Sequence, residues 1–520
     1  MSFFPGAVFM KKKVLMIYPE IPITFWSLKY ALEMAGFKST LPPLGLMTVA
    51  SLLPDSYDIK LIDMAVSEVK KNDILWADIV FISAMIIQKN SFEKVVQLCN
   101  ELHVPVAAGG PYPTSSHESI SGVDYFILNE AEITLPGFIK DYESGMAKKL
   151  YMSDEKPDIT QTPVPRLDLI DISSYSSMAL QYSRGCPFNC EFCDIIEMFG
   201  RIPRTKLPDQ FLDEMNAVYK TGFRGFLFIV DDNFIGNKKH VKALLKKIIE
   251  WQKERGYPFA LFTEASVDLA QDDELLDLMV EAGFGEVFLG IETPDSDTLV
   301  DIQKKQNLRL DIFESVRKIQ NHGIEVMAGF IVGFDSDPEN IFEQQINFIQ
   351  KAAIPQAMVG LLSALPNTQL FRRLAKEKRL KGLSTGDNLK IDVNFLTKMP
   401  LDTLIDGYKY IISEIYNPKK YFERCMSLLK QMPEEHRLWD IIKKTRTKDF
   451  FKDTDFSYVK QLKIFLNIVF KMTFTHYGFY FLRFLKDSMR YNYKYFFYAI
   501  SLSARGYHYF KVADMLGKNN

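Results

Sequence analysis

Residues 183–193 read Ser-Arg-Gly-Cys-Pro-Phe-Asn-Cys-Glu-Phe-Cys and hold three of the chain's five cysteines. The spacing Cys-x3-Cys-x2-Cys puts Cys186, Cys190 and Cys193 on one short loop. Three thiolates on such a loop can hold three irons of a [4Fe–4S] cube, because soft sulfur ligands suit iron–sulfur clusters. The fourth iron then has no protein ligand from this loop, and an open metal position is where a substrate can bind. The loop therefore predicts a cluster that does chemistry.

Two other uses of these cysteines fit the sequence less well. Zinc usually takes four ligands, and the nearest further Cys or His along the chain is His240. A disulfide would leave one of the three thiols unpaired. Cys99 and Cys425 lie within apolar helical patterns, where buried thiols are expected. The pattern favours a cluster over zinc or structural thiols.

The composition is that of a globular protein with about two to four domains. Of its 520 residues, 47% are apolar and 25% are charged, and the net charge is −2. This charge offers no large basic face, so we expect no nucleic-acid partner. Lys11–Lys13 follow the weakly apolar first residues, which is the wrong order for a signal peptide. Few cysteines and an oxygen-sensitive cluster favour a reducing cytoplasm.

In the first third of the chain, residues 1–145, short apolar runs alternate with helical patterns such as residues 92–102. This rhythm predicts an α/β domain with a doubly wound, Rossmann-like parallel sheet, whose ligands bind at the carboxyl ends of the strands. The predicted strands are residues 14–18, 59–62, 79–83, 104–108 and 125–128.

Small and polar residues follow these strands. Ser83 ends the third strand, Gly109, Gly110 and Thr114 follow the fourth, and Glu130 follows the fifth. Paired glycines let a backbone approach a ligand closely, although a lone Gly-Gly also makes an ordinary turn.

In residues 165–385 the same rhythm continues and gives six strand–helix units. This number predicts a partial (βα)6 TIM-like barrel, with its chemistry at the carboxyl ends of the strands. The predicted strands are residues 178–182, 225–230, 259–263, 286–291, 325–332 and 357–362. The residues near their carboxyl ends include Asp231, Asp232, Glu264, Glu292, Gly329 and Gly333.

Carboxylates at adjacent strand ends suit a ribose and an ammonium group. The competing interpretation of any single one is a helix N-cap, a role for which Thr293 and Asp311 are also the right residue types. Agreement at successive strand ends is harder to attribute to capping.

Residues 386–520 read as an α-helical C-terminal domain, with helical patterns at 401–416, 421–431, 458–473 and 479–490. Aromatic residues crowd its end and alternate with lysines and arginines. This pattern is typical of a helical cap packed on the barrel, or of a helix face at a membrane surface. Nucleic-acid stacking is the third interpretation, and the near-neutral chain argues against it. No uncharged run here reaches the ~18 residues of a membrane span.

The cysteine loop, with Phe192 just before its last cysteine, resembles that of the radical S-adenosylmethionine (SAM) enzymes. The loops at Ser83, Gly109 and Glu130 resemble the cobalamin-binding domain that precedes many such barrels. No Asp-x-His-x-x-Gly is present, so the resemblance implies cobalamin without a histidine ligand. The likeness runs to about residue 440 and is closest to cobalamin-dependent radical SAM proteins with a helical C-terminal domain, a group that includes the hopanoid C-2 methylases.

By this resemblance, Asp231 and Asp232 occupy the place of the SAM-amine motif, and Glu264 and Glu292 that of nucleoside or ribose contacts. Gly329 and Gly333 lie in the adenine-side strand. Arg201, Arg204 and Lys206 offer charge for the SAM carboxylate, or form a solvated basic loop. Asn367 stands where the family's closing motif has glycine, and asparagine tolerates the left-handed conformation.

The resemblance implies a [4Fe–4S] cluster, SAM and cobalamin as cofactors, and an enzyme that methylates an unactivated carbon. One SAM would methylate cobalamin, and a second would yield the radical that takes hydrogen from the substrate. It implies a small apolar substrate such as a polycyclic lipid, and an external electron donor such as flavodoxin or ferredoxin. The C-terminal region suggests peripheral membrane contact. A non-methylating cyclisation or oxidation and a non-catalytic cofactor sensor remain the alternatives.

Overall fold

The computed structural model describes residues 11–433, apart from 388 and 392, and residues 458–518. The chain forms two compact units. One comprises residues up to Pro22 together with Pro43–Asp171, and the other comprises Ile23–Pro42 and the chain from Ile172 onward. The chain thus enters the second unit briefly before it completes the first. The domain limits at residues 145, 165, 385 and 386 stay predictions.

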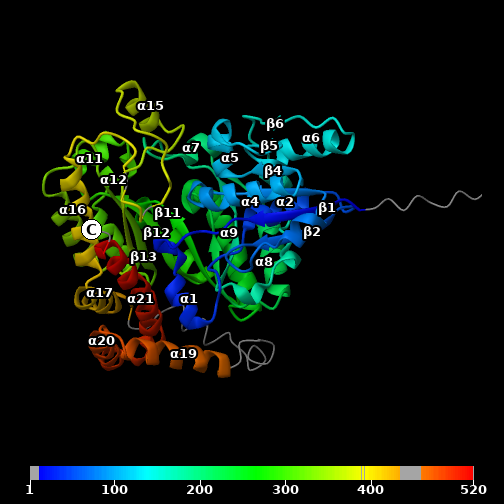
Figure 1. Ribbon diagram of the computed structural model, residues 1–520. Coiled ribbons are helices and arrows are strands. Elements are labelled where there is room, and N and C mark those ends of the chain that lie inside the picture. The colour runs from blue at the N-terminus through cyan, green and yellow to red at the C-terminus, as the bar shows by residue number, and fades with distance from the viewer. Residues whose placement is uncertain (1–10, 388, 392, 434–457, 519–520) are drawn as a thin grey trace, which may run out of the picture. The chain divides into compact units, whose positions relative to one another are not determined.

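The first unit contains the predicted parallel sheet (Figure 1), with six strands in the order β2-β1-β3-β4-β5-β6; the sequence predicted five of them and missed β6. Val14–Ile17 of β1 are completely buried, which explains why this strand is a continuous apolar run. The strand order reverses between β1 and β3, the place where ligands bind in such sheets. The strands are β1 (Lys13–Tyr18), β2 (Asp58–Asp63), β3 (Ile79–Ser83), β4 (Val106–Gly109), β5 (Tyr125–Ile127) and β6 (Leu150–Tyr151). The helices are α2 (Leu44–Leu52), α3 (Lys71–Trp76), α4 (Lys89–Glu101), α5 (Pro111–Ser116) and α6 (Ala131–Glu143).

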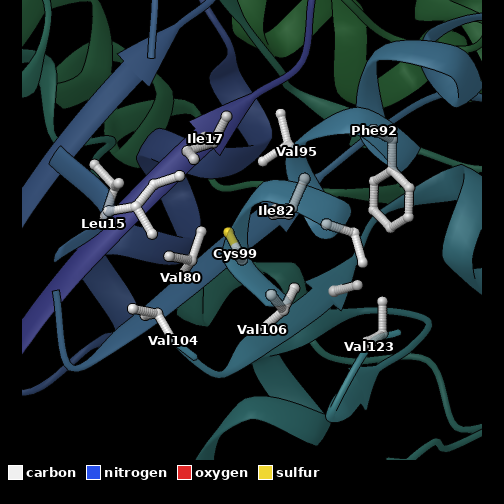
Figure 2. Packing of buried hydrophobic residues seen from close by; sticks show 14 of the residues in the cluster. Leu15, Ile17, Val80, Ile82, Phe92, Val95, Cys99, Val104, Val106 and Val123 are labelled. Atoms are coloured by element: carbon white, nitrogen blue, oxygen red, sulfur yellow. The ribbon is translucent and has the colours of Figure 1, made fainter. Parts of the chain in front are cut away.

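One face of this sheet packs against α4. Figure 2 shows Cys99 of that helix among strand residues such as Val80 and Val106. The Cys99 side chain is completely buried, and burial raises the pKa of its thiol to about 12. It acts as a small apolar side chain, as expected, and so does the buried Cys425 in the second unit.

The second unit contains six parallel strands in the consecutive order β7-β10-β11-β12-β13-β14. Within the described residues, β7 and β14 are the two edges of this sheet and are not paired by backbone hydrogen bonds. The sheet therefore does not close, and the predicted partial barrel is confirmed. Its strands are β7 (Ser177–Leu180), β10 (Gly225–Ile229), β11 (Phe259–Ala265), β12 (Phe284–Glu292), β13 (Glu325–Val332) and β14 (Ala357–Leu361). Its longer helices are α8 (Pro208–Lys220), α9 (Lys238–Glu254), α10 (Asp273–Ala282), α13 (Ile312–Asn321) and α14 (Ile341–Lys351). The shorter ones are α1 (Lys29–Ala35), α7 (Ile195–Phe199), α11 (Ser296–Asp301), α12 (Lys305–Leu308) and α15 (Gln369–Lys376).

The end of the chain is helical, as predicted. Its described helices are α16 (Leu401–Ile415), α17 (Pro418–Gln431), α19 (Tyr458–Thr473), α20 (Gly478–Tyr491) and α21 (Phe496–Lys518). The sequence patterns missed α21, because residues 502–506 are all buried and the helix packs on several neighbours at once. A helix covered on most sides has no amphipathic period to detect. Arg505 of α21 pairs with Glu286 at 3.0 Å and with Glu325 at 2.9 Å, which fastens the helix to the barrel.

The segment 23–42 is held by residues far along the chain. Phe25 stacks on Tyr509 of α21, with ring centroids 4.4 Å apart. The neighbouring His508 donates from Nε2 to the carbonyl oxygens of Thr24 and Phe25. Burial lowers the pKa of His508 to about 4, so the ring is neutral at physiological pH. None of the helices that the structure describes is both long and apolar enough to cross a bilayer.

Candidate active site

The cysteine loop begins in a short antiparallel ladder between β8 (Ser183–Arg184) and β9 (Arg204–Thr205). Two backbone hydrogen bonds fold the loop between them: Cys186 N donates to Gly200 O, and Cys193 N donates to Cys190 O, each at 3.3 Å. Two side-chain amides donate toward sulfur, from Gln306 to Cys190 at 3.6 Å and from Asn233 to Cys186 at 3.9 Å. Soft thiolates that accept N–H bonds are the donor set of an iron–sulfur cluster, so these residues fit that group.

Asp231 and Asp232 hold the entry to this loop. The Asp231 carboxylate accepts bonds from the backbone N–H groups of Tyr182 and Ser183, at 2.7 and 2.8 Å, and from the Ser183 hydroxyl at 2.6 Å. The Asp232 carboxylate accepts from Gly185 N at 2.9 Å. Burial raises the pKa of the Asp231 carboxyl to about 7, although these bonds favour its charged form. The two residues therefore position the cluster loop from the next strand of the barrel.

A second set of contacts holds the middle of the loop and was missed in the sequence. The guanidinium of Arg373, on α15, pairs with Glu191 at 2.5 Å. Asn189 accepts from Gln369 at 3.0 Å and donates to Gln303 at 2.9 Å. These partners lie more than 100 residues away, so no local pattern marks them.

The expected basic motif divides into two roles. Arg201 and Arg204 donate to carbonyl oxygens of Pro187 and Phe199, at 3.2 and 3.3 Å, and so brace the loop. Lys206 forms a buried ion pair with Glu214. It therefore belongs to the fold rather than to a solvated basic loop.

Glu264 lies on β11, one strand further from the cysteines, and its side chain is partly exposed. Burial raises the pKa of its carboxyl to about 8, and the negative charges of Asp232, Asp231 and Glu292 add to the shift. Within the described residues, no donor lies within hydrogen-bonding distance of this carboxylate. A group that is costly to ionise alone becomes favourable to ionise beside a cation. The site therefore suits a positively charged ligand.

Glu292 ends β12 in the left-handed region, with φ +65°, and forms a buried ion pair with Lys304 at 2.5 Å. Burial disfavours the charged form of Lys304, but the carboxylate of Glu292 and the thiols of Cys190 and Cys193 outweigh it and raise the pKa of Lys304. Gly290 leaves room for the pair, because a Cβ there would lie 2.6 Å from the Glu292 Oε1. Lys304 thus brings a positive charge between the carboxylates and the cluster loop.

Gly329 and Gly333 lie in and just after β13. A Cβ at Gly329 would lie 2.9 Å from the Phe288 ring, so a side chain there does not fit. The backbone N–H of Gly333 donates to Asp337 at 2.7 Å. Asn367 has φ +65°, which confirms the left-handed conformation expected from its motif.

The two residues for which a helix cap was the competing interpretation had different outcomes. Asp311 does cap α13, with its side chain accepting from Glu314 N at 3.1 Å. Thr293 is not a cap, because Asp295 caps α11 and accepts from Thr298 N at 2.9 Å. Thr293 accepts from the backbone N–H of Asp295 and shapes the turn before that cap.

In the first unit, the predicted residues gather at the carboxyl edge of the sheet. Ser83 ends β3, Gly109 ends β4, and Gly110 has φ +86°. A Cβ at Gly110 would lie only 2.4 Å from the Ser83 Oγ, so the two loops approach as closely as glycine allows. Thr114 accepts from Asn129 N at 3.0 Å, and Glu130, which precedes α6, is buried. Small side chains at this edge fit a large macrocycle that needs space more than charge.

Two further polar residues at the same edge were missed, Asp63 at the end of β2 and Gln88 after β3; both are buried. Gln88 donates to Pro19 O at 2.5 Å. Burial, and then the Asp63 charge, raise the pKa of Tyr18 at the end of β1. The residue types alone carry no sign of this burial.

Across the described residues, no three His, Cys, Asp or Glu side chains converge on the position of one metal ion. The three cysteines of a cube bind three different irons and need not converge in this way.

Three domain families match the chain. Residues 32–139 match the B12 binding domain, residues 180–349 the radical SAM superfamily, and residues 368–520 a domain of unknown function, DUF4070. These matches fall on the sheet of the first unit, on the barrel and on the C-terminal helices.

Whole-chain relatives agree. An uncharacterized methyltransferase of Synechocystis is 46% identical over 79% of this chain and 77% of its own length. The hopanoid C-2 methylase of Rhodopseudomonas palustris is 34% identical over 79% of this chain and 78% of its own. The radical SAM methyltransferase TsrM of Kitasatospora setae, solved with cobalamin and a [4Fe–4S] cluster, shares the fold with a TM-score of 0.60. It is 14% identical, and the match covers 92% of this chain and all of TsrM. The chain belongs to the cobalamin-dependent radical SAM methyltransferases, enzymes whose cofactors are a [4Fe–4S] cluster, SAM and cobalamin.

Proposed function

We propose that this enzyme methylates an unactivated carbon of a small, apolar, polycyclic substrate of the hopanoid type. The observation that carries the substrate class is the 34% identity with a hopanoid C-2 methylase over about four-fifths of both chains. A carbon of this kind has no acidic proton, so acid–base catalysis by side chains does not reach it.

An aromatic wall on the barrel supports an apolar substrate. Side chains alternate along a strand, so Phe262 and Glu264 of β11 share the sheet face opposite to the buried Leu261. Phe262 stacks on Phe228 of β10, with ring centroids 4.5 Å apart and planes 4° from parallel.

The wall extends along the next strand. Phe288 of β12 lies opposite Glu264 in register, and Trp26 meets its ring edge-on at 5.4 Å. All four rings of the wall, those of Phe228, Phe262, Phe288 and Trp26, are partly exposed. The aromatic ring of Phe262 thus lies two positions before the Glu264 carboxylate on β11. An apolar substrate on the ring and a cationic ligand at the carboxylate would be held side by side.

The residues of the two edges have separate tasks in this proposal. Cys186, Cys190 and Cys193 would hold the cluster, Glu264 would face the charged end of SAM, and the edge around Ser83 and Gly110 would hold cobalamin. When bound, these groups supply the radical and the methyl carrier, which no side chain can offer. The electron would come from an external donor of the flavodoxin or ferredoxin class. We place the enzyme in the cytoplasm, where its five free cysteines stay reduced.

The test is a product analysis with anaerobically reconstituted enzyme. SAM with a trideuterated methyl group, a reductant and a hopanoid are incubated together, and we expect a product in which a CD3 group replaces one hydrogen and keeps all three deuteriums. Phe262→Ala, at the aromatic wall, should raise KM for the hopanoid while uncoupled formation of 5′-deoxyadenosine continues. Phe313→Ala, which removes a partly exposed ring on the helix α13 that contacts none of the wall's rings, is the matched control.

A hopanoid that returns unmethylated, while the enzyme still cleaves SAM, would contradict the substrate class. A product without the extra methylene would support cyclisation or oxidation instead. A fully loaded protein that forms no 5′-deoxyadenosine would favour the non-catalytic sensor.

A further inference from the structure

The end of the chain carries exposed aromatic rings. Among the described residues, every aromatic side chain that is more than 60% exposed lies between positions 470 and 497. These side chains are Phe470 (66%), Phe474 (77%), Phe479 (70%), Tyr493 (74%) and Phe497 (68%). A globular protein leaves single apolar residues exposed everywhere, but a concentration of large rings marks an interaction surface.

The exposed residues of α19 form one stripe. Lys463, Leu466, Phe470 and Phe474 follow one another at steps of three or four positions, which places them along one side of the helix and its end, and Lys471 lies beside Phe470. The opposite side, with Ile468 and Met472, is buried. Two rings of the stripe, Phe470 and Phe474, lie 4.8 Å apart.

A matching stripe runs along α20. Phe479, Leu482, Lys486 and Met489 are exposed at helical spacing, and Arg483 and Arg490 flank them. The other side of α20, which includes Phe481 and Phe484, is buried and packs toward α17. The two helices contact each other, and Figure 1 shows them along one edge of the second unit. We call the exposed residues of both helices, with Tyr493, Lys494 and Phe497, the aromatic-basic face.

The charged residues of the aromatic-basic face are almost all basic. Positions 463–497 hold six basic residues, Lys463, Lys471, Arg483, Lys486, Arg490 and Lys494, all exposed. They hold one acidic residue, Asp487, which lies 3.7 Å from Arg483. The segment therefore has five more basic than acidic side chains, whereas the chain as a whole has a net charge of −2. Two copies of such a face would repel each other, which argues against a second copy as the occupant.

We propose that the aromatic-basic face binds the surface of an anionic lipid bilayer, with α19 and α20 lying in the plane of the interface. Rings and leucines on such a helix enter the boundary between headgroups and acyl chains, to a depth of about 5–10 Å, and lysines and arginines contact the anionic headgroups. The enzyme is then a peripheral membrane protein. This inference concerns a different surface from the candidate active site and does not depend on the identity of the substrate.

Vesicle flotation of the full-length protein tests the proposal. Vesicles of phosphatidylcholine with phosphatidylglycerol should carry the protein upward, pure phosphatidylcholine should carry at least tenfold less, and added salt should release it. Phe474→Ser with Phe479→Ser should reduce binding tenfold or more at any salt concentration. Lys486→Glu with Arg490→Glu should reduce it similarly on anionic vesicles, because each basic residue near such a surface contributes about 1 kcal/mol.

The matched controls change the same residue types elsewhere. Tyr410→Ser replaces an exposed ring on α16, and the double variant Lys253→Glu with Lys376→Glu reverses two exposed charges. Both variants should float as the wild type does. All substituted side chains are exposed, so thermal midpoints should agree within a few degrees. The proposal is wrong if anionic vesicles leave the protein at the bottom, or if the double phenylalanine variant still floats. A dimer that the phenylalanine substitutions dissociate would assign the face to a second copy and would also overturn it.

Discussion

The two parallel sheets of this chain each have six strands, and in both the candidate site residues lie at the carboxyl ends of the strands. The carboxyl edge of the first sheet and that of the barrel differ in the charge and the size of these residues. The edge of the first unit carries Ser83, Gly109 and Gly110, with backbone in close contact. The barrel edge carries Asp231, Glu264 and Glu292, and Lys304 pairs with the last of them. In our proposal the same architecture would therefore serve two chemistries, with space for a large macrocycle at one edge and a negative field for a cation at the other.

The largest effect should come from the cluster loop. Cys190→Ala removes one of three thiolates, so we expect the iron–sulfur absorbance to be lost and 5′-deoxyadenosine formation to fall to background. Iron content and product analysis measure both. Cys99→Ala is the control, because this buried thiol lies in the first unit and should leave iron content unchanged. If Cys190→Ala keeps a wild-type cluster, the assignment of the barrel edge fails.

Breaking the ion pair of the barrel edge should follow. Lys304→Met leaves the buried Glu292 carboxylate without its partner, so the free energy of unfolding should fall by about 3–5 kcal/mol. Urea denaturation measures the loss. The double variant with Glu292→Gln should recover most of it, because no charge then stays buried. Equal losses in both variants would mean that the pair matters for its shape and not for its charge.

At the carboxyl edge of the sheet in the first unit, substitutions should act through the size of the side chain and not through its charge. Gly110→Ala forces a side chain into the left-handed region and toward the Ser83 hydroxyl, so stability should fall by roughly 1–2 kcal/mol or more. The protein should also retain less corrinoid after desalting, measured by its absorbance. Gly45→Ala, at a helix position with nothing within 4 Å of the added Cβ, is the control and should not destabilise. Unchanged corrinoid retention in Gly110→Ala would remove this loop from the cobalamin site.

The last effect is a slope with pH, which is kept small because the Glu264 side chain is partly exposed and solvent screens its charge. The pKa of Glu264 is raised from 4.5 to about 8, so the folded protein binds the proton more tightly than the unfolded chain does. Its contribution must therefore lower stability as pH rises from about 4.5 to 8, and stay level above that range. Compared with the wild type, Glu264→Gln should gain stability across this window. Thermal midpoints at several pH values measure the difference, and Glu250→Gln, exposed on α9, should show none.

The sequence predicted the strands closely because both sheets are parallel and covered, so their strands are dense apolar runs. It predicted strand-end residues such as Asp231 and Glu264 for the same reason, since a strand's end can be read from the sequence. It did not predict what those residues contact. Asp231 bonds to backbone N–H groups about 48 residues earlier, and Arg373 reaches Glu191 across 182 positions. Such partners depend on how strands are placed side by side, which no local period records.

Helix α21 is an element that the sequence patterns did not predict at all. Its burial on most sides removes the one-sided apolar pattern on which helix prediction depends, and its many aromatic residues, serines and glycines are not strong helix formers. The stripes of α19 and α20 were predictable because one side of each helix stays exposed.

The early segment 23–42 also has a consequence for biosynthesis. Phe25 and Thr24 are translated some 480 positions before their partners Tyr509 and His508. At usual elongation speeds of about 5–20 residues per second, the wait is on the order of a minute. Until then, segment 23–42 of the nascent chain lacks the α21 residues against which it packs, which makes it a natural client for a chaperone. A premature stop codon before α21 would remove Tyr509 and His508, and segment 23–42 would lose these contacts.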